Sequence, residues 1–539
     1  MESKNWSMAI RRDLLWILLL SGIVQAFWGV RLHHPAYFDA YYYTVGGQNL
    51  ANGQGFTANV IWQYLNAPDG LPAPTFTYWM PLPALLAALG YKVTGTFRGA
   101  QAPFWLMATL MPLLSYLIAW RLSRRRWQAV TAALFTMAGG YYAAYWIQPS
   151  TFALFGFVGG LFLVVLAAAV EEQTAVYWAA AGALAGLGHL ARADGLLLAG
   201  VAGMLWLNLF GQSVKIQRVK IKEQPVDSHQ LSIIHSLMNL LVFGLGYLLV
   251  MGGWFWHTYQ LIGRPLSTVG TQTIFLTQYN DVFSYGRSFT LADYLAWGWW
   301  NILQSKVKAV WLALQTFVAV TGLTAFSFFM VWGWIRYSGK QETKLFLRPF
   351  TWYTLLLYAV MSLVFTFPGQ RGSLLHSSTA LWPWSMALAV GGLDAAVDWI
   401  AARRRSWRPE QAKRIFAAAF VVMVWVISWA VSERLPLGDE EAAVYKQVAA
   451  MLPPDAVVMY GAPADFHYHT GLPAIATPAE PLPVVLQAAD RYGAAYLLLD
   501  PDRPPPLDGL YEGTETNGRV VKIWEEDGYQ LYRLDGDGS

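Results

Sequence analysis

Cysteine and charge are the two things that this sequence lacks. Its 539 residues include no cysteine, which excludes disulfides, thiolate catalysis and Cys-based zinc or iron–sulfur sites. Charged residues make up 13% of the chain, about half of the roughly 25% found in an average soluble domain. Hydrophobic residues make up 55%, and the mean hydropathy is +0.34. A long chain with so few charges is predicted to be a polytopic membrane protein.

Other absences narrow the function. The net charge of +4 is small, and the basic residues cluster in short loops between apolar runs, so nucleic acid is not an expected partner. The sequence contains no glycine-rich phosphate loop, which disfavours a nucleotide substrate. It also contains no internal repeat and no low-complexity tract.

Long apolar runs define the expected architecture. A hydrocarbon core of roughly 30 Å needs about 20 apolar residues per helix. By this measure the sequence contains eleven candidate spans, several of them short. They are residues 13–30, 102–121, 127–147, 151–170, 174–190, 195–211, 232–252, 308–335, 350–367, 374–393 and 415–432. The proline-rich stretch 80–95 is predicted to be an interfacial helix. The expected fold class is an all-α polytopic bundle.

The distribution of Lys and Arg predicts the orientation of the spans. The loops assigned to one side carry 21 basic residues, and the loops assigned to the other carry 8. The positive-inside rule makes the richer side cytoplasmic. The N-terminus is therefore expected in the cytoplasm, in a plasma or inner membrane. Loops 31–101 and 253–307, and everything after Ser432, are expected outside.

The residues from 433 to 539 read as a small α/β domain. DEEAAVYKQVAAML and LPVVLQAADRYG have helical spacing, DAVVMY and AAYLLLD read as strands, and RVVKIWEE with YQLYRL reads as a closing hairpin. This alternation is typical of an α/β layer structure. The chain is thus expected to divide into a membrane domain, residues 1–432, and an outer domain, residues 433–539.

Polar residues gather at the predicted outer ends of the helices, while the spans themselves hold almost no acids or bases. The outer group consists of Asp39, His189, Arg192, Asp194, His257, Gln370, Arg371 and His376. Arginine forks bind phosphate with two parallel hydrogen bonds, and a carboxylate can deprotonate an attacking hydroxyl. Both groups at a membrane surface suit a lipid-phosphate-linked substrate whose tail lies in the bilayer.

Several stretches resemble the GT-C glycosyltransferases that use polyprenyl-phosphate sugars. The nearest resemblance is to protein O-mannosyltransferases and aminoarabinose–lipid A transferases, glycosyltransferase families 39 and 83. The stretches are FDAYYYTVGGQNLANGQGF, TYWMPLPALLAALGYKVTG, LARADGLLLAG, WHTYQLIGRPLS, RGSLLHSSTALWPW, LPPDAVVMYGAPADFHYHTGLPAI and DRYGAAYLLLD. They extend over nearly the whole chain, although each motif is loose.

The resemblance implies an inverting transfer of a sugar from a polyprenyl-phosphate carrier to a lipid, glycan or protein acceptor on the outer face. The family's first-loop aspartate corresponds to Asp39, as general base or as organiser of the acceptor site. The arginines that hold the lipid phosphate correspond to Arg371 and Arg192.

The sequence departs from the family pattern at two acidic positions. Ala40 stands where many relatives have a second acid, and QPSTFALF stands where many have an acid at the outer end of the fourth span. Both departures count against a divalent metal, which stays an open alternative to a site without cofactor. They also leave open a diverged or inactive member. The WWDYG-type signature of oligosaccharyltransferase subunits is missing from the tail.

Each candidate residue also has a purely structural interpretation. Asp39 suits the N-cap of an interfacial helix. Arg192 and Asp194 suit a local salt bridge, and Arg371 suits a membrane-edge anchor. His376 is expected to face the bundle interior, because a lipid-facing histidine is costly.

The aromatic and histidine candidates divide in the same way. Tyr42 and its two tyrosine neighbours suit either sugar stacking or an interfacial aromatic belt. His257 follows WFW and suits a boundary cluster. His467 and His469 in FHYH would share one face of a strand, as metal ligands often do.

Two other function classes stay open. A flippase or transporter for lipid-linked sugars would place polar residues deep in the spans and would not depend on one outer carboxylate. A non-catalytic protein with the GT-C fold would tolerate the missing second acid. The position of Asp39, in an open cavity or packed away, discriminates among the three.

Overall fold

The computed structural model describes residues 2–220, 227–404, 408–433 and 439–536. The chain forms two compact units. Unit 1 combines residues 1–31, 103–265 and 306–435, and unit 2 combines the remaining segments, 32–102, 266–305 and 436–539. Residues 434–438, beside the predicted domain boundary, lie outside the described residues, as do parts of the predicted loops 212–231 and 402–414.

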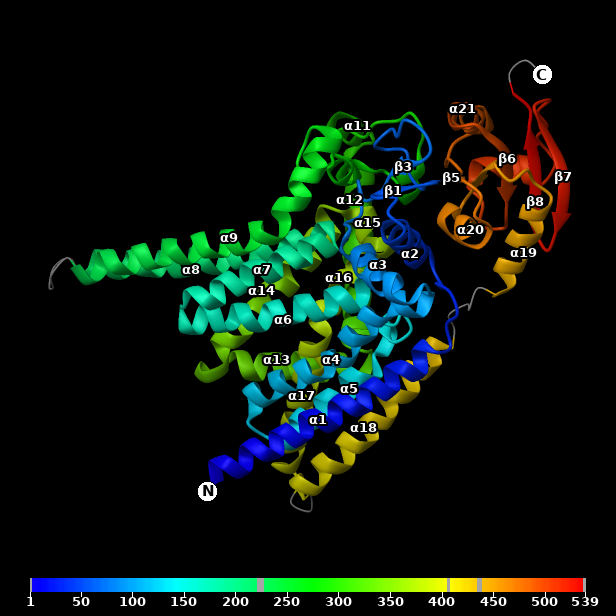
Figure 1. Ribbon diagram of the computed structural model, residues 1–539. Coiled ribbons are helices and arrows are strands. Elements are labelled where there is room, and N and C mark those ends of the chain that lie inside the picture. The colour runs from blue at the N-terminus through cyan, green and yellow to red at the C-terminus, as the bar shows by residue number, and fades with distance from the viewer. Residues whose placement is uncertain (1, 221–226, 405–407, 434–438, 537–539) are drawn as a thin grey trace. The chain divides into compact units, whose positions relative to one another are not determined.

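Among the described residues of unit 1, all the regular elements are helices (Figure 1). Its first half contains α1 (Glu2–Gly29), α4 (Phe97–Ser123, which begins in unit 2), α5 (Arg126–Ala138), η1 (Gly140–Tyr142), α6 (Thr151–Glu172), α7 (Ala175–Ala191), η2 (Ala193–Gly195), α8 (Leu196–Lys220) and α9 (Asp227–Ile262). Its second half contains α12 (Trp299–Thr316, which begins in unit 2), η5 (Phe317–Thr321), α13 (Ala325–Ser338), α14 (Gln341–Leu363), α15 (Thr366–Pro368), η6 (Gly369–Ser373), α16 (Leu374–Ser378), η7 (Thr379–Leu381), α17 (Trp382–Ala401) and α18 (Pro409–Ser432).

The chain is an integral membrane protein, but the predicted count of eleven spans is not confirmed. Among the described residues, six helices are long and apolar enough to cross a membrane, or seven if one bent pair counts as a span. The six are Phe97–Ser123, Thr151–Glu172, Ala193–Gln212, Ile233–Ile262, Thr366–Ala401 and Pro409–Ser432. Two predicted spans, 127–147 and 174–190, correspond to helices of only 13 and 17 residues, α5 and α7.

The predicted single span 308–335 is broken. Helix α12 continues into the π turn η5, and the chain then bends by 92° before α13. Leu323 and Thr324, at the bend, adopt positive φ angles of 48° and 54°. Residues other than glycine rarely adopt a positive φ, and a positive φ does not occur within a regular right-handed helix. The bend therefore ends one helix and begins another.

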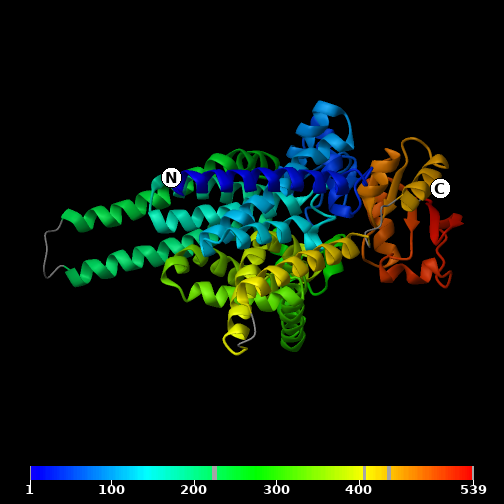
Figure 2. The same ribbon diagram turned by 90° about the horizontal axis from the view of Figure 1, so that it is seen from below.

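Small residues bring α7 and α9 into close contact. A Cβ atom added to Gly182 would lie 2.0 Å from the carbonyl oxygen of Phe243, and one added to Gly246 would lie 2.3 Å from that of Ala179. Small residues allow the two backbones to lie this close. In a membrane the hydrophobic effect does not drive helices together, so their association depends on such close packing. Helices α8 and α9 also run side by side in both views (Figures 1 and 2).

Unit 2 mixes helices and strands. The segment from the first loop contains α2 (Phe38–Ala51), β1 (Thr57–Ala58), β2 (Val60–Ile61), β3 (Ala73–Pro74) and α3 (Leu82–Thr94), the last at the predicted interfacial helix. The middle segment contains α10 (Val269–Gln272), η3 (Thr273–Phe275), η4 (Tyr279–Phe283) and α11 (Leu291–Ala296). The C-terminal segment contains α19 (Asp439–Ala450), β4 (Val457–Tyr460), α20 (Pro463–Thr470), β5 (Ala474–Ala476), α21 (Leu482–Tyr492), β6 (Ala494–Leu499), η8 (Pro505–Leu507), α22 (Asp508–Tyr511), β7 (Val520–Glu526) and β8 (Tyr529–Leu534).

The predicted α/β pattern of the tail is confirmed by a six-stranded sheet in the order β2-β5-β4-β6-β8-β7. The pairs from β2 to β6 are parallel, and β8 and β7 form the predicted antiparallel hairpin. Strand β2 comes from the first loop and pairs with β5, with Val60 opposite Ala474 and Ile61 opposite Ile475. The loop that carries Asp39 therefore completes the edge of the C-terminal sheet.

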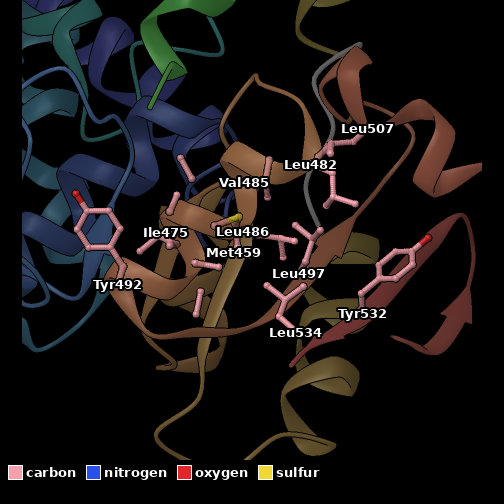
Figure 3. Packing of buried hydrophobic residues seen from close by; sticks show 14 of the residues in the cluster. Met459, Ile475, Leu482, Val485, Leu486, Tyr492, Leu497, Leu507, Tyr532 and Leu534 are labelled. Carbon is pink, nitrogen blue, oxygen red and sulfur yellow. The ribbon is translucent and has the colours of Figure 1, made fainter. Parts of the chain in front are cut away.

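Alternate residues of the strands face two layers of helices. Leu497 and Met459 pack with Leu482, Val485 and Leu486 of α21, as Figure 3 shows. Their neighbours Leu498 and Val458 face the other side and pack with α19 and α20. The sheet thus lies between helices on both faces, as expected of strands that form a parallel sheet.

One element of the tail was predicted wrongly. FHYH was expected on a strand, but it lies in helix α20. Residues two apart on a helix point about 200° apart because the helix has 3.6 residues per turn. His467 and His469 therefore do not share a face. The His467 Nδ1 atom lies 2.8 Å from the Leu472 carbonyl oxygen, and His469 faces Tyr41 of the first loop.

Candidate functional site

Asp39 lies in the first turn of α2, and its side chain is half-buried. The N-cap position of this helix belongs to Tyr37, so Asp39 does not occupy the cap that the structural interpretation assigned to it. A carboxylate in the first turn of a helix is stabilised by the helix dipole. This placement favours the charged form of Asp39.

The aromatic residues that follow Asp39 pack inside unit 2. Tyr41, Tyr42 and Tyr43 are all buried. The Tyr42 hydroxyl accepts a hydrogen bond of 3.1 Å from the Phe76 amide, and its ring lies 5.2 Å from that of Trp79. Burial raises the pKa of Tyr42 to about 12. In the structure, Tyr42 joins α2 to Phe76 and Trp79, further along the first loop.

A hydrogen-bonded chain connects this loop to the C-terminal domain within unit 2. The His34 Nδ1 atom lies 2.8 Å from the Pro35 carbonyl oxygen, which can only accept, so Nδ1 carries the hydrogen. The same nitrogen lies 3.0 Å from the Tyr41 hydroxyl, which lies 2.9 Å from Nε2 of His469. The Tyr41 hydroxyl thus lies within hydrogen-bond distance of both histidines. Sequence inspection missed this contact because Tyr41 and His469 are 428 residues apart.

A second acid lies on the C-terminal side of this chain of contacts. Asp465 belongs to α20, one turn before His469, and only 7% of its surface is exposed. Burial raises the pKa of Asp465 well above its usual value, and the charges of Glu441 and Asp39 raise it further. No local pattern in the sequence pointed to this residue, because α20 and α2 are far apart along the chain.

In unit 1, the structure brings three of the predicted residues into one network. Arg192 follows α7 and Asp194 lies in η2, and their side chains form an ion pair of 2.9 Å with 13% and 12% exposed. Arg192 also donates to Ser377 over 3.1 Å and to Thr151 over 3.1 Å, while Ser377 donates to Asp194. The ion pair is local, as the structural interpretation expected, and it also joins α7 to α6 and α16.

His376 is the third member of the network. It is buried, its Nδ1 atom lies 2.6 Å from the Thr151 hydroxyl, and its ring stacks on Phe152 at 3.8 Å. It therefore faces the bundle interior, as expected. Thr151 and Phe152 belong to QPSTFALF, the stretch that lacks the family's acid. Here hydroxyls and an arginine surround the histidine.

Arg371 differs from Arg192 in its surroundings. It lies in the π turn η6, next to Gly372, whose φ of 163° interrupts the helical run, and its side chain is exposed. An exposed guanidinium at the end of an apolar helix can reach a lipid headgroup, which suits both the phosphate-binding and the anchor interpretation.

The other two histidines of the predicted outer group, His189 and His257, pack against aromatic rings. His189 is buried with Nδ1 bonded to the Tyr247 hydroxyl. The ring of His257 lies 5.0 Å from that of Trp254. Within the described ranges, no group of three or more His, Asp or Glu side chains is placed to hold a metal ion.

A separate ionic cluster lies at the other end of unit 1. The Asp394 side chain is 2% exposed and forms ion pairs with Arg125 (2.9 Å), Arg336 (3.1 Å) and Lys413 (2.9 Å). Arg125 comes from RLSRRR, which the sequence suggested only as a topology determinant. Helix α6 connects the two regions. Its first residue, Thr151, contacts Arg192, and its last turn lies roughly 30 Å away. In that last turn Glu171 pairs with Arg121, which is close to Arg125 in sequence.

Comparisons with known proteins address the fold. No protein-family model matches the sequence, and no curated protein sequence matches it. Among solved structures, the chain is similar to the oligosaccharyltransferase AglB from Archaeoglobus fulgidus, at 12% identity and a TM-score of 0.55, over 90% of this chain and 69% of that one. It is also similar to ArnT from Cupriavidus metallidurans bound to undecaprenyl phosphate, at 12% identity and a TM-score of 0.50, over 98% of both chains.

The two solved structures share one class of fold. They are structures of the GT-C type, and a similarity that covers 90% and 98% of this chain shows that it has the GT-C fold. The predicted fold class, a helical membrane bundle with a small C-terminal α/β part, is therefore confirmed.

Proposed function

We propose that this chain is a membrane glycosyltransferase that moves a sugar from a polyprenyl-phosphate carrier to an acceptor hydroxyl on the outer face of the membrane. The observation that supports this most is the similarity over 98% of both chains to ArnT, a structure bound to undecaprenyl phosphate. The acceptor would be a lipid, a glycan or a protein, and the N-terminus would lie in the cytoplasm.

The proposed reaction is a single displacement. The acceptor oxygen bonds to the anomeric carbon as the bond from that carbon to the phosphate oxygen breaks, so the configuration inverts. The proton of the acceptor hydroxyl passes to the Asp39 carboxylate, which acts as general base. The lipid phosphate leaves with the electron pair of the broken bond. Asp39 suits this role because it is only half-buried and lies where the helix dipole favours its charged form.

The phosphate would be bound by residues of unit 1. Arg192 has a planar fork that its contacts to Asp194, Ser377 and Thr151 hold in one orientation. An arginine fixed in this way stabilises charge on a leaving phosphate without reorganising during the reaction. Arg371, which is exposed, would contact the same class of headgroup.

The experiment is a transfer assay with radiolabelled polyprenyl-phosphate sugars in membranes that contain the wild type, Asp39→Asn or Asp69→Asn. Asp69 is an exposed aspartate of the same loop and serves as the matched control. We expect Asp39→Asn to lose transfer by about 10²–10⁴-fold, the usual contribution of a general base, and Asp69→Asn to transfer like the wild type. Equal transfer by all three proteins would remove Asp39 from the chemistry.

The alternatives predict other outcomes. A transporter would move the lipid-linked sugar across vesicle membranes without forming a product, and Asp39→Asn would leave that movement unchanged. A non-catalytic protein would bind the lipid phosphate without transferring sugar from any donor. Either result would overturn the proposal.

A further inference from the structure

We propose that α12 is an in-plane membrane helix, which lies in a membrane–water interface with one face among the acyl chains of the lipid and another face in water. The inference goes beyond the proposed function and does not depend on it. It assigns lipid as the partner of a helix face that the rest of the described chain leaves exposed.

The side chains of α12 divide into three faces, because successive residues of a helix turn by about 100°. The face that packs on the protein consists of side chains that are at most 8% exposed, Ile302, Ser305, Ala309 and Ala313. The next sector, about 100° wide, holds exposed apolar side chains, Trp300, Leu303, Val307, Val310, Trp311 and Leu314. The third sector, about 60° wide, holds exposed polar side chains, Asn301, Gln304, Lys308 and Gln315.

Neither lipid alone nor water alone suits the two exposed faces. The polar face runs from Asn301 to Gln315, roughly 20 Å along the helix axis. In a span these positions would contact lipid, where a side chain such as Lys308 is costly. The apolar face would be costly in water, since Val307 and Trp311 are 62% and 59% exposed. A helix with both faces along its whole length, and with tryptophans on the apolar one, suits an interface.

The direction of the neighbouring helix α13 supplies a second observation. Near their first residues, α13 and α17 both meet Gly140, where an added Cβ atom would lie 3.2 Å from the Leu323 side chain and 2.5 Å from that of Trp382. Toward their last residues, Arg336 of α13 pairs with Asp394 of α17 over 3.1 Å. The two helices therefore run side by side in the same direction.

The bend between α12 and α13 turns α12 away from that direction. Helix α17 belongs to the segment Thr366–Ala401, which is long and apolar enough to cross a membrane. Helix α13 follows this span, and α12 lies at 92° to α13. Because spans tilt by about 20° on average, α12 lies close to the plane of the membrane. The bend and the three faces thus agree on an in-plane helix.

A side-chain contact joins α12 to the segment that carries Arg371. The Lys306 ammonium donates to the Thr366 hydroxyl. Thr366 is the first residue of α15, which leads directly into η6 and Arg371. An interfacial α12 therefore brings the beginning of this segment near the membrane surface, where lipid headgroups lie.

The test is a depth measurement by spin labelling of the full chain in vesicles of phosphatidylcholine and phosphatidylglycerol. Because the sequence contains no cysteine, each single variant carries one nitroxide. The ratio of its collision rates with oxygen, which concentrates among acyl chains, and with a water-soluble nickel chelate reports its depth. We expect Val307→Cys and Leu314→Cys, two turns apart on the apolar face, to give the same high ratio. We expect Gln304→Cys and Gln315→Cys, on the polar face, to give a low ratio.

Helix α18 provides the matched control. Ile415 and Val422 are also seven residues apart, are 60% and 63% exposed, and belong to the candidate span Pro409–Ser432. Labels at Ile415→Cys and Val422→Cys should differ in depth by roughly 10 Å, the rise of two helical turns. Their ratios should therefore differ, whereas those at Val307 and Leu314 should not.

Three results would overturn the proposal. A depth difference between Val307 and Leu314 as large as that in α18 would make α12 part of a span. Frequent collision with nickel on the apolar face would place this face in water, and shielding from both reagents would show that protein covers it. Leu303→Cys and Val310→Cys, also seven residues apart on this face, replace a variant that does not fold. The measurement requires no sugar transfer, so its outcome is separate from that of the transfer assay.

Discussion

Asp394 and Asp465 are both buried acids, and their surroundings are opposite. Asp394 in unit 1 has three cations within ion-pair distance, from α13, α18 and the turn before α5. Asp465 in unit 2 has two acids, Glu441 and Asp39, as the charges that act on it. A carboxylate surrounded by cations joins helices, whereas burial and neighbouring acids favour the neutral form of a carboxyl group. The first arrangement is structural, and the second is what proton chemistry needs.

The largest effect is expected from removing Asp394. Asp394→Asn would leave Arg125, Arg336 and Lys413 without their shared carboxylate, and breaking a buried ion pair from one side costs about 3–5 kcal/mol. The free energy of unfolding in detergent micelles measures this loss. Glu410→Gln removes an exposed partner of Lys413 and should change it by less than about 1 kcal/mol. Equal effects of the two substitutions would contradict the structural role of Asp394.

The next effect concerns Arg192. Arg192→Lys keeps the charge but loses the planar fork, so we expect a fall in kcat/KM of roughly 10–100-fold, in line with a lost charged hydrogen bond of about 1.5–3 kcal/mol. Transfer assays at varied donor concentration measure it. Arg371→Lys is the comparison variant, because that side chain is exposed. A larger loss at Arg371 than at Arg192 would make Arg371 the principal phosphate contact.

The stability of unit 2 should depend on pH through Asp465. The folded pKa of this carboxyl is raised, so its favourable contribution is complete below the unfolded value of about 3.9 and is lost as the pH rises toward the folded pKa. Relative to the wild type, Asp465→Asn should therefore gain stability between pH 4.5 and pH 8. Thermal unfolding across this range measures the gain. A difference that stays constant with pH would show that Asp465 is charged throughout.

The smallest effect is expected at Tyr41. Tyr41→Phe keeps the ring and removes the hydroxyl between His34 and His469, which should cost about 1 kcal/mol of unfolding free energy. Tyr529→Phe tests a hydroxyl elsewhere in the same unit. A loss of several kcal/mol in Tyr41→Phe would contradict this expectation, because it would exceed what the hydrogen bonds of one hydroxyl contribute.

The sequence predicted what local patterns encode. The strands and helices of the tail followed from their periodicity, and the interfacial helix after Pro81 followed from a short apolar run that ends at Gly95. FHYH misled because alternating aromatic and histidine residues resemble a strand. Pro463 at its first turn and Gly471 after its last residue are signals of a helix.

Long-range contacts were beyond the sequence. Nothing near Val60 indicates that it pairs with Ala474, and nothing near Asp465 indicates that the charges of Glu441 and Asp39 raise its pKa. The residues of the Arg192 network were predicted singly, but their connection through Thr151 and Ser377 depends on how three helices pack. Such contacts depend on tertiary structure. The periodic patterns of a single sequence predict helices and strands but not which distant residues come into contact.

The pairing of β2 with β5 also affects when the first loop can fold during synthesis of the chain. Tyr64 and the carbonyl group of Ala476, which are hydrogen-bonded, are separated by 412 residues of chain. At 5–20 residues per second, synthesis of the partner strand follows that of the first loop by roughly 20–80 s. During this interval the loop that carries Asp39 has no sheet to join. The proposed base would therefore reach its final surroundings only when the last fifth of the protein has been made.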